Sequence, residues 1–261
     1  MIVKSIYKEN RTFFLAYFFL IAIALFILFA HTKANGFILL NFYHSPFLDF
    51  AFQGITLLGD GIFSVVFFLA LLVVKKRHLS FMVFVSFASS GIAAQVLKYF
   101  ISEARPAVFL EKTNYPYFIE NVTLHNFHSF PSGHTTSIFA LVSIIAFASK
   151  DKKYALPLLL LGVLVGYSRM YLGQHFMVDV TVGSLIGVLF SMISWMLFQS
   201  FYIRLRKKIS RRKNRRPNEN KIFFIYWFTV TNQYLPQILR ALQAYNRLSI
   251  LPVFSCHTPL L

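Results

Sequence analysis

Apolar residues along this chain gather into six blocks, each of about the length that crosses a lipid bilayer. The blocks are residues 13–30, 50–74, 79–97, 134–149, 154–171 and 176–201. A helix needs ~20 residues to cross a hydrocarbon core of ~30 Å, and in lipid its backbone groups must bond within the segment. The pattern predicts an all-α, polytopic membrane protein with six transmembrane helices in a bundle, although the fourth and fifth blocks are short or polar at one end.

Composition supports this interpretation. Of the 261 residues, 57% are hydrophobic, 18% are aromatic and 13% are charged. Ordinary soluble domains are roughly half apolar and a quarter charged. The composition therefore excludes an ordinary soluble domain and favours an integral membrane protein.

The net charge of +17 invites a nucleic-acid interpretation, but its distribution favours a membrane topology. Basic residues precede the first block, separate the second from the third and the fourth from the fifth, and follow the sixth. They are Lys4, Lys8, Arg11, Lys75, Lys76, Arg77, Lys150, Lys152, Lys153 and the run 204–221. In a six-span alternation all of these lie on one side, so the positive-inside rule places both termini in the cytoplasm. The run after the sixth block is typical of a contact with anionic lipid headgroups.

The same pattern predicts the domain organisation. Residues 1–203 form the membrane domain, 204–221 a basic juxtamembrane segment, and 222–261 a tail that is either an amphipathic surface helix or disordered. We interpret the first block as a retained helix, because no convincing signal-peptide cleavage site follows it. The single cysteine, Cys256, excludes an internal disulfide framework.

Three short motifs lie beside the predicted helix ends. They are KYFISEARP at 98–106, PSGH at 131–134 and SRMYLGQHFMVD at 168–179. Their spacings, K-x6-R-P, P-S-G-H and S-R-x5-H-x3-D, carry many specified positions in order, so chance is a weak explanation. At every defining position they resemble the signature of the type 2 phosphatidic acid phosphatase superfamily, over roughly residues 50–201.

The residue chemistry alone already indicates phosphoryl transfer. Lys98, Arg105 and Arg169 supply positive charge for the equatorial oxygens of a phosphoryl transition state without a metal ion. A helix that starts at PSGH would present backbone N–H groups to a phosphate. His175 and Asp179 are four residues apart and share a helix face, so the carboxylate can orient the imidazole and leave its other nitrogen free to attack.

The resemblance implies the remaining roles. His175 would form a phosphohistidine, and His134 would protonate the leaving group and then activate water. The predicted catalytic residues are thus His175, His134 and Asp179, and the predicted phosphate-binding residues are Lys98, Arg105, Ser132, Gly133, Arg169 and Ser168. We expect no metal and no cofactor. His125, His128, Asp60 and Glu103 receive no role in this interpretation.

The predicted topology brings all three motifs to the extracytoplasmic interface, where a substrate could keep its head in water and its tail in the bilayer. Lipid phosphates and diphosphates fit this description: phosphatidate, phosphatidylglycerophosphate, undecaprenyl diphosphate or a lipid A phosphate. The sequence predicts such a phosphatase, in a bacterial inner membrane, with the bilayer and its lipid substrate as partners and with neither nucleic acid nor an obligate protein partner. A lipid phosphotransferase, or a non-catalytic phospholipid-binding or transport protein, remains the alternative.

Overall fold

The computed structural model describes residues 2–110, 115, 118–119, 122–210, 225 and 227, without the side chains of 2–4 and 202–210. This part of the chain is helical and contains no strand, as predicted. Its elements are α1 (Ile2–Glu9), α2 (Arg11–Ala30), α3 (Lys33–Leu40), α4 (Pro46–Thr56), the 3-10 turn η1 (Leu57–Gly59), α5 (Gly61–Val73), α6 (Arg77–Phe100), α7 (Pro106–Phe109), α8 (Gly133–Ala148), η3 (Lys152–Tyr154), α9 (Ala155–Tyr171) and α10 (Met177–Ser210).

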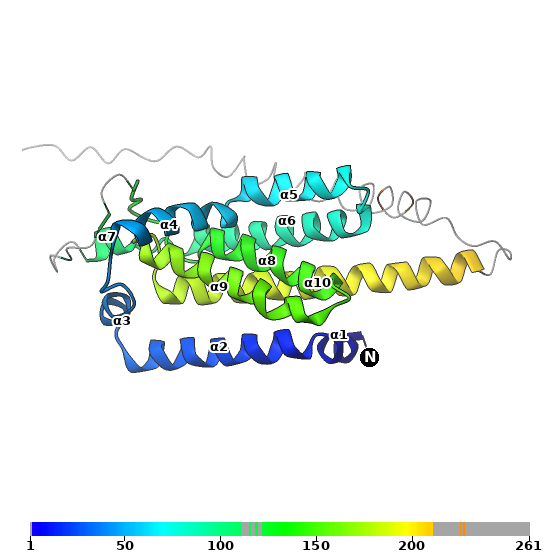
Figure 1. The fold of residues 1–261 in the computed structure, drawn as a ribbon, viewed down its shortest axis with the longest axis horizontal. Helices are drawn as coiled ribbons and strands as arrows, with labels where there is room; N and C mark the ends of the chain where they lie inside the picture. The colour runs from blue at the N-terminus through cyan, green and yellow to red at the C-terminus, as the bar shows by residue number, and fades with distance from the viewer. Residues whose placement is uncertain are drawn as a thin grey trace, which may run out of the picture. The chain divides into compact units, whose positions relative to one another are not determined.

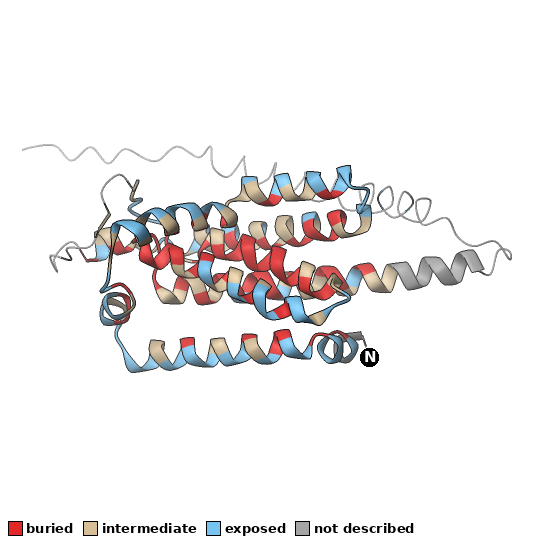
Figure 2. Ribbon diagram, in the orientation of Figure 1, coloured by how far each residue is buried: buried red, intermediate tan, exposed pale blue. Residues whose placement is uncertain are grey.

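Helix α8 forms the buried axis of the bundle. Twelve of its sixteen residues are buried, and it contacts α5, α6, α9 and the turn η1, as its red ribbon in Figure 2 shows. Helix α10 approaches α8 closely through Gly183 and Gly187. A Cβ on Gly183 would lie 2.7 Å from the Ser132 carbonyl oxygen, and one on Gly187 would lie 2.7 Å from that of Thr136. Small residues at this spacing let helix backbones pack closely in membranes.

Hydroxyl groups join the helices around this axis. The Ser86 and Ser191 hydroxyls lie 2.8 Å apart between α6 and α10, and Ser191 also donates to the Ala140 carbonyl of α8 at 2.9 Å. Tyr17 and Ser184 connect α2 to α10 at 3.1 Å. Such bonds between helices stabilise a bundle whose outer surface contacts lipid.

Four described helical segments are long and apolar enough to cross a membrane: Arg11–Ala30, Arg77–Phe100, Lys152–Tyr171 and Met177–Phe201. The pair Pro46–Gly59 and Gly61–Val73 makes a fifth if it counts as one span, and its two parts are bent by 56°. The predicted block 50–74 is therefore not a straight helix. Helix α8 is apolar but has only 16 residues, so a sixth span there stays a prediction.

The chain divides into two compact units, Met1–Gln199 and Ser200–Leu261. The first contains all three motifs. In the second, the structure describes α10 as far as Ser210 together with residues 225 and 227. The predicted basic segment lies mostly outside the described residues, and so does nearly all of the predicted tail.

Candidate active site

Four helix ends bring the three motifs together at one end of the first unit (Figure 1). Lys98 lies near the end of α6, and PSGH leads into the start of α8. Arg169 belongs to the last turn of α9, and Asp179 to the first turn of α10. Because α6 and α9 run towards this end while α8 and α10 start from it, residues up to 81 positions apart in the sequence share one region, as predicted.

The His175 and Asp179 side chains face each other. Nδ1 of His175 lies 3.4 Å from Oδ2 of Asp179, and both side chains are buried. His175 lies in the turn between α9 and α10, before α10 begins at Met177, so the prediction that it shares a helix face with Asp179 is wrong, although the two side chains meet. This geometry directs Nδ1 towards the carboxylate and leaves Nε2 as the nitrogen on the other side of the ring.

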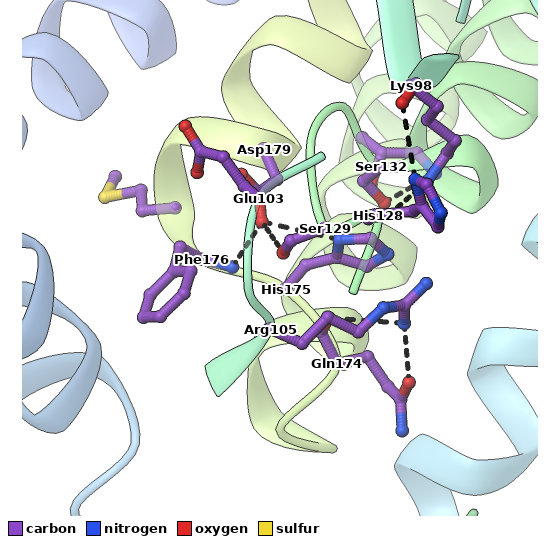
Figure 3. Close-up of polar contacts among 12 residues, drawn as sticks. Lys98, Glu103, Arg105, His128, Ser129, Ser132, Gln174, His175, Phe176 and Asp179 are labelled. Atoms are coloured by element: carbon purple, nitrogen blue, oxygen red, sulfur yellow. Dashed lines mark hydrogen bonds and ion pairs between the residues drawn. The ribbon is translucent and has the colours of Figure 1, made fainter. Parts of the chain in front are cut away.

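The Asp179 carboxylate is itself held in place (Figure 3). Its Oδ2 accepts a hydrogen bond from the Phe176 backbone N–H at 2.9 Å and another from the Ser129 hydroxyl. The Asp179 carbonyl accepts from the Ser132 N–H at 3.0 Å. These bonds connect the second and third motifs, and two donors on one carboxylate oxygen stabilise its ionised form.

The PSGH segment starts α8 as the sequence predicts. The Ser132 side chain is the N-cap and accepts from the Thr135 N–H at 3.4 Å and from the Thr135 hydroxyl at 2.9 Å. The first N–H groups of a helix have no carbonyl partner within it, and here they belong to Gly133 and His134. A Cβ placed on Gly133 would meet no atom within 4 Å. The start of α8 therefore has free space beside it.

Two of the predicted phosphate-binding cations are fixed by loop carbonyls. Lys98 Nζ donates to the His128 carbonyl at 2.8 Å, and His128 Nδ1 lies 3.3 Å from the Lys98 carbonyl. Arg105 Nε donates to the Phe127 carbonyl at 3.1 Å, and its NH1 donates to Gln174 Oε1 at 2.8 Å. Both cations are half-buried.

The third predicted cation, Arg169, is more deeply buried, with 9% of its surface exposed. Its NH1 donates to Oγ1 of Thr56 at 2.8 Å, and its Nε has no hydrogen-bond partner among the described residues. The neighbouring Ser168 hydroxyl donates to the Val165 carbonyl of its own helix at 2.7 Å. That bond occupies the Ser168 hydroxyl proton, and the phosphate role of Ser168 stays a prediction.

Burial and charge set the protonation of the site. Burial lowers the pKa of His175 well below its ordinary value; Asp179 opposes this shift, and the positive charge of Arg169 adds to it. The imidazole is therefore neutral near pH 7 and has a free lone pair. Burial also lowers the pKa of Arg105, while the charge of Asp179 raises it. Because the ordinary pKa of arginine is above 12, Arg105 keeps its charge.

Within the described part of the chain, no three His, Cys, Asp or Glu side chains gather as a metal site would require. The strong positive charges here belong to Lys98, Arg105 and Arg169. His134, half-buried in the first turn of α8, lies within electrostatic reach of all three.

Sequence reasoning missed several residues that support this region. Ser129 bonds Asp179, Gln174 bonds Arg105, and Thr56 bonds Arg169. His128 received no role, yet its carbonyl accepts from Lys98 Nζ and its Nδ1 lies near the Lys98 carbonyl. Glu103 forms an ion pair with Lys33. Glu103 and Gln174 stand at variable positions inside the motifs, and His128 and Ser129 stand just before PSGH. Only that location, or for Thr56 a polar residue inside an apolar block, could have pointed to them.

Comparison with known proteins places these features in a family. The model of the PAP2 superfamily matches residues 79–203. The chain is 33% identical over 141 residues to undecaprenyl-diphosphatase BcrC of Bacillus subtilis, which is 50% of this chain and 68% of that protein. The chain belongs to the PAP2 superfamily.

Two further relatives are similar to this chain in sequence or in structure. The chain is 32% identical over 110 residues to lipid A 1-phosphatase of Rhizobium johnstonii, which is 42% of this chain and 43% of that protein. The crystal structure of a PAP2-type phosphatidylglycerolphosphate phosphatase from Bacillus subtilis matches with a TM-score of 0.55 at 26% identity, over 74% of this chain and 96% of that one. These relatives are lipid phosphatases, and the fold is that of an integral membrane protein.

Proposed function

We propose that this protein is an integral-membrane phosphatase that hydrolyses a lipid phosphate or lipid diphosphate through a phosphohistidine. The observation that carries the proposal is the buried His175 and Asp179 pair, 3.4 Å apart, at the helix ends that also carry the three cations. The combination suits covalent catalysis, because a neutral imidazole can attack phosphorus while its other nitrogen is held.

In the first step, Nε2 of His175 bonds to phosphorus and the bond from phosphorus to the lipid oxygen breaks. His134, kept protonated by the bound phosphate dianion despite the neighbouring cations, donates its proton to that oxygen, so a lipid alcohol or a lipid monophosphate leaves. Lys98, Arg105 and Arg169 balance the negative charge on the phosphoryl oxygens, and the N–H groups of Gly133 and His134 donate to them.

In the second step, the now neutral His134 takes a proton from water as its oxygen attacks phosphorus. The bond from phosphorus to nitrogen breaks, inorganic phosphate leaves, and His175 returns to the neutral state. His134 switches from acid to base because the second step is chemically the reverse of the first, with water in place of the lipid leaving group.

The substrate class rests on the membrane helices and on relatives that act on undecaprenyl diphosphate and lipid A. The purified protein in detergent, with EDTA present, should release phosphate from at least one member of a panel of phosphatidate, phosphatidylglycerophosphate, undecaprenyl diphosphate and a lipid A phosphate. Vanadate should inhibit the release, and His175→Ala should abolish it. Activity that is lost with EDTA and restored by Mg²⁺ would contradict the mechanism, and a newly phosphorylated acceptor lipid would indicate a transferase.

We further propose that the site faces away from the cytoplasm, in a bacterial inner membrane, because the basic residues gather at the opposite helix ends. A membrane-impermeant maleimide on intact cells tests this in a Cys256→Ser background. Asn35→Cys, at an exposed position of α3 beside the site, should be labelled, and Lys75→Cys, between α5 and α6, should not. The opposite labelling would overturn the topology.

A further inference from the structure

The bend between α4 and α5 forms part of the wall of the candidate site. Helix α4 ends at Thr56, η1 covers Leu57–Gly59, and α5 starts at Gly61 at an angle of 56° to the preceding helix. The Asp60 side chain caps α5 by accepting from the Ile62 N–H at 2.9 Å. The bend lies outside residues 79–203, which carry the family match.

Gly59 brings this bend against His134. A Cβ on Gly59 would lie 3.0 Å from the His134 Cβ, 3.0 Å from its carbonyl oxygen and 2.6 Å from Val165 Cγ1. Only a residue without a side chain fits there. The bend therefore contacts both α8 and α9 at the level of the motifs.

Thr56 makes the polar contact of the bend with the site. Its Oγ1 accepts from NH1 of Arg169 at 2.8 Å, and each of the two residues has 9% of its surface exposed. A hydrogen bond from a charged donor is shorter and stronger than a neutral one. The bond restricts the guanidinium plane, because a planar group held at one nitrogen can no longer rotate freely.

The opposite part of the guanidinium keeps donors for a ligand. Nε of Arg169 is buried and has no hydrogen-bond partner in the described part of the chain. Arginine binds phosphate best when two parallel N–H groups meet two oxygens, which requires a fixed plane. With NH1 bonded to Thr56 and Nε unused, the Arg169 guanidinium is oriented before an anion binds.

We propose that Thr56 is a positioning residue that orients Arg169 for the phosphoryl group. The inference rests on the proposed function, because it assigns Arg169 to the phosphate. Thr56 acts through Arg169 and does not touch the reacting atoms. Its hydroxyl would accept from NH1 throughout the reaction, so that Nε and NH2 meet the developing charge without reorganisation.

Thr56→Val tests the hydroxyl, because valine keeps the branched shape and cannot accept a hydrogen bond. We expect kcat/KM for phosphate release to fall about tenfold, mostly in kcat. Thr56→Ser, which keeps the acceptor, should stay within about threefold of the unmodified protein. If the valine variant does not fold, Thr56→Ala gives the same comparison.

Thr181→Val is the matched control. Thr181 is also buried, and its hydroxyl donates to Met177 in its own helix at 2.8 Å. Its position two residues after Asp179 places it on the opposite face of α10. Thr181→Val should therefore leave turnover unchanged, which separates the loss of a hydroxyl in general from the loss of this contact.

A double-mutant cycle tests whether Thr56 acts on turnover through Arg169. In an Arg169→Lys background, Thr56→Val should reduce turnover less than about twofold, because the guanidinium that it orients is gone. Equal losses in both backgrounds would overturn the inference, as would Thr56→Val turnover equal to that of the unmodified chain.

A binding measurement keeps this inference separate from the proposed function. Vanadate should raise the melting temperature of the unmodified protein, and Thr56→Val should reduce that rise. If the unmodified protein hydrolyses no lipid phosphate but shows this Thr56-dependent rise, the proposed function fails and the inference stands. If hydrolysis occurs and the rise does not depend on Thr56, the inference fails alone.

Discussion

Helices α2 and α8 are both rich in apolar residues, yet the protein uses them in opposite ways. Only four of the twenty residues of α2 are buried, and Phe26 and Phe29 are 73% and 89% exposed. In α8, twelve of sixteen residues are buried. Helix α2 presents most of its surface to the surroundings, whereas α8 is enclosed by other helices (Figure 2).

The difference shows which residues mark the interior of a membrane protein. In lipid, an apolar side chain gains little by moving from the bilayer to the bundle, so apolarity does not separate the two places. Small and hydroxyl residues do, because they permit close approach and bonds between helices. The buried part of α8 contains Thr135, Thr136, Ser137 and Ser143, while no hydroxyl is buried in α2 except that of Tyr17.

The largest expected difference between the two helices is the effect on turnover of replacing a histidine in each region. His134→Ala, in the first turn of α8, should lower turnover about 10³-fold, because the proposed proton donor to the leaving group is lost. His31→Ala, at the C-cap of α2, should leave turnover unchanged. Phosphate release from the lipid panel measures both, and equal activity of the two variants would remove His134 from the mechanism.

A phenylalanine comparison tests packing. Phe147 of α8 is 3% exposed and contacts Phe13, Phe14 and Trp195, so Phe147→Ala should lower the free energy of unfolding by about 3 kcal/mol through the cavity it leaves. Phe26→Ala, on the exposed face of α2, should change it by less than about 0.5 kcal/mol. Unfolding in detergent, followed by loss of helical signal, gives both values. Similar losses would mean that Phe26 is enclosed in the folded protein and not exposed on α2.

The smallest effect is a shift of the pH profile. Because burial lowers the pKa of His175, its neutral, attacking form should persist below pH 6.5 in the unmodified protein, and protonation would remove activity only at lower pH. Phe176→Ala opens the neighbouring buried site to water, so the pKa should rise and the acid limb of kcat/KM should move upward by about one pH unit.

Phe29→Ala, on exposed α2, is the control for that shift and should leave the acid limb in place. An acid limb that does not move in Phe176→Ala would show that His175 does not set it. The reverse movement, to lower pH, would contradict burial as the cause of the lowered pKa.

Local sequence signals predicted several contacts and helix ends of this region that the structure contains. The spacing of four residues brought His175 close to Asp179, although His175 precedes α10, and Ser132 capped α8 as a serine before glycine indicates. Alternation of spans and basic residues brought Lys98 and Arg169 to the same end of the bundle. These features depend on residues close in sequence or on the simple count of crossings.

Other features depended on distant packing. The apolar block 50–74 contains a polar break at Asp60, between Gly59 and Gly61, but that break alone does not predict a bend of 56°, because glycine and aspartate also end helices without such a bend. The contact of Thr56 with Arg169 joins residues 113 positions apart. No local pattern relates them, since their distance is decided by how α4 and α9 pack.

By itself, the amino-acid sequence determined the helical class, the positions of the motifs and the chemistry that their side chains can perform, because hydrophobic periodicity and motif spacing act over a few turns. Only the tertiary structure decided which apolar helix is enclosed, where the second block bends and which hydroxyls hold Asp179 and Arg169. Those outcomes follow from close packing between whole helices, where a glycine or a threonine on one helix matters only through the atom that meets it on another.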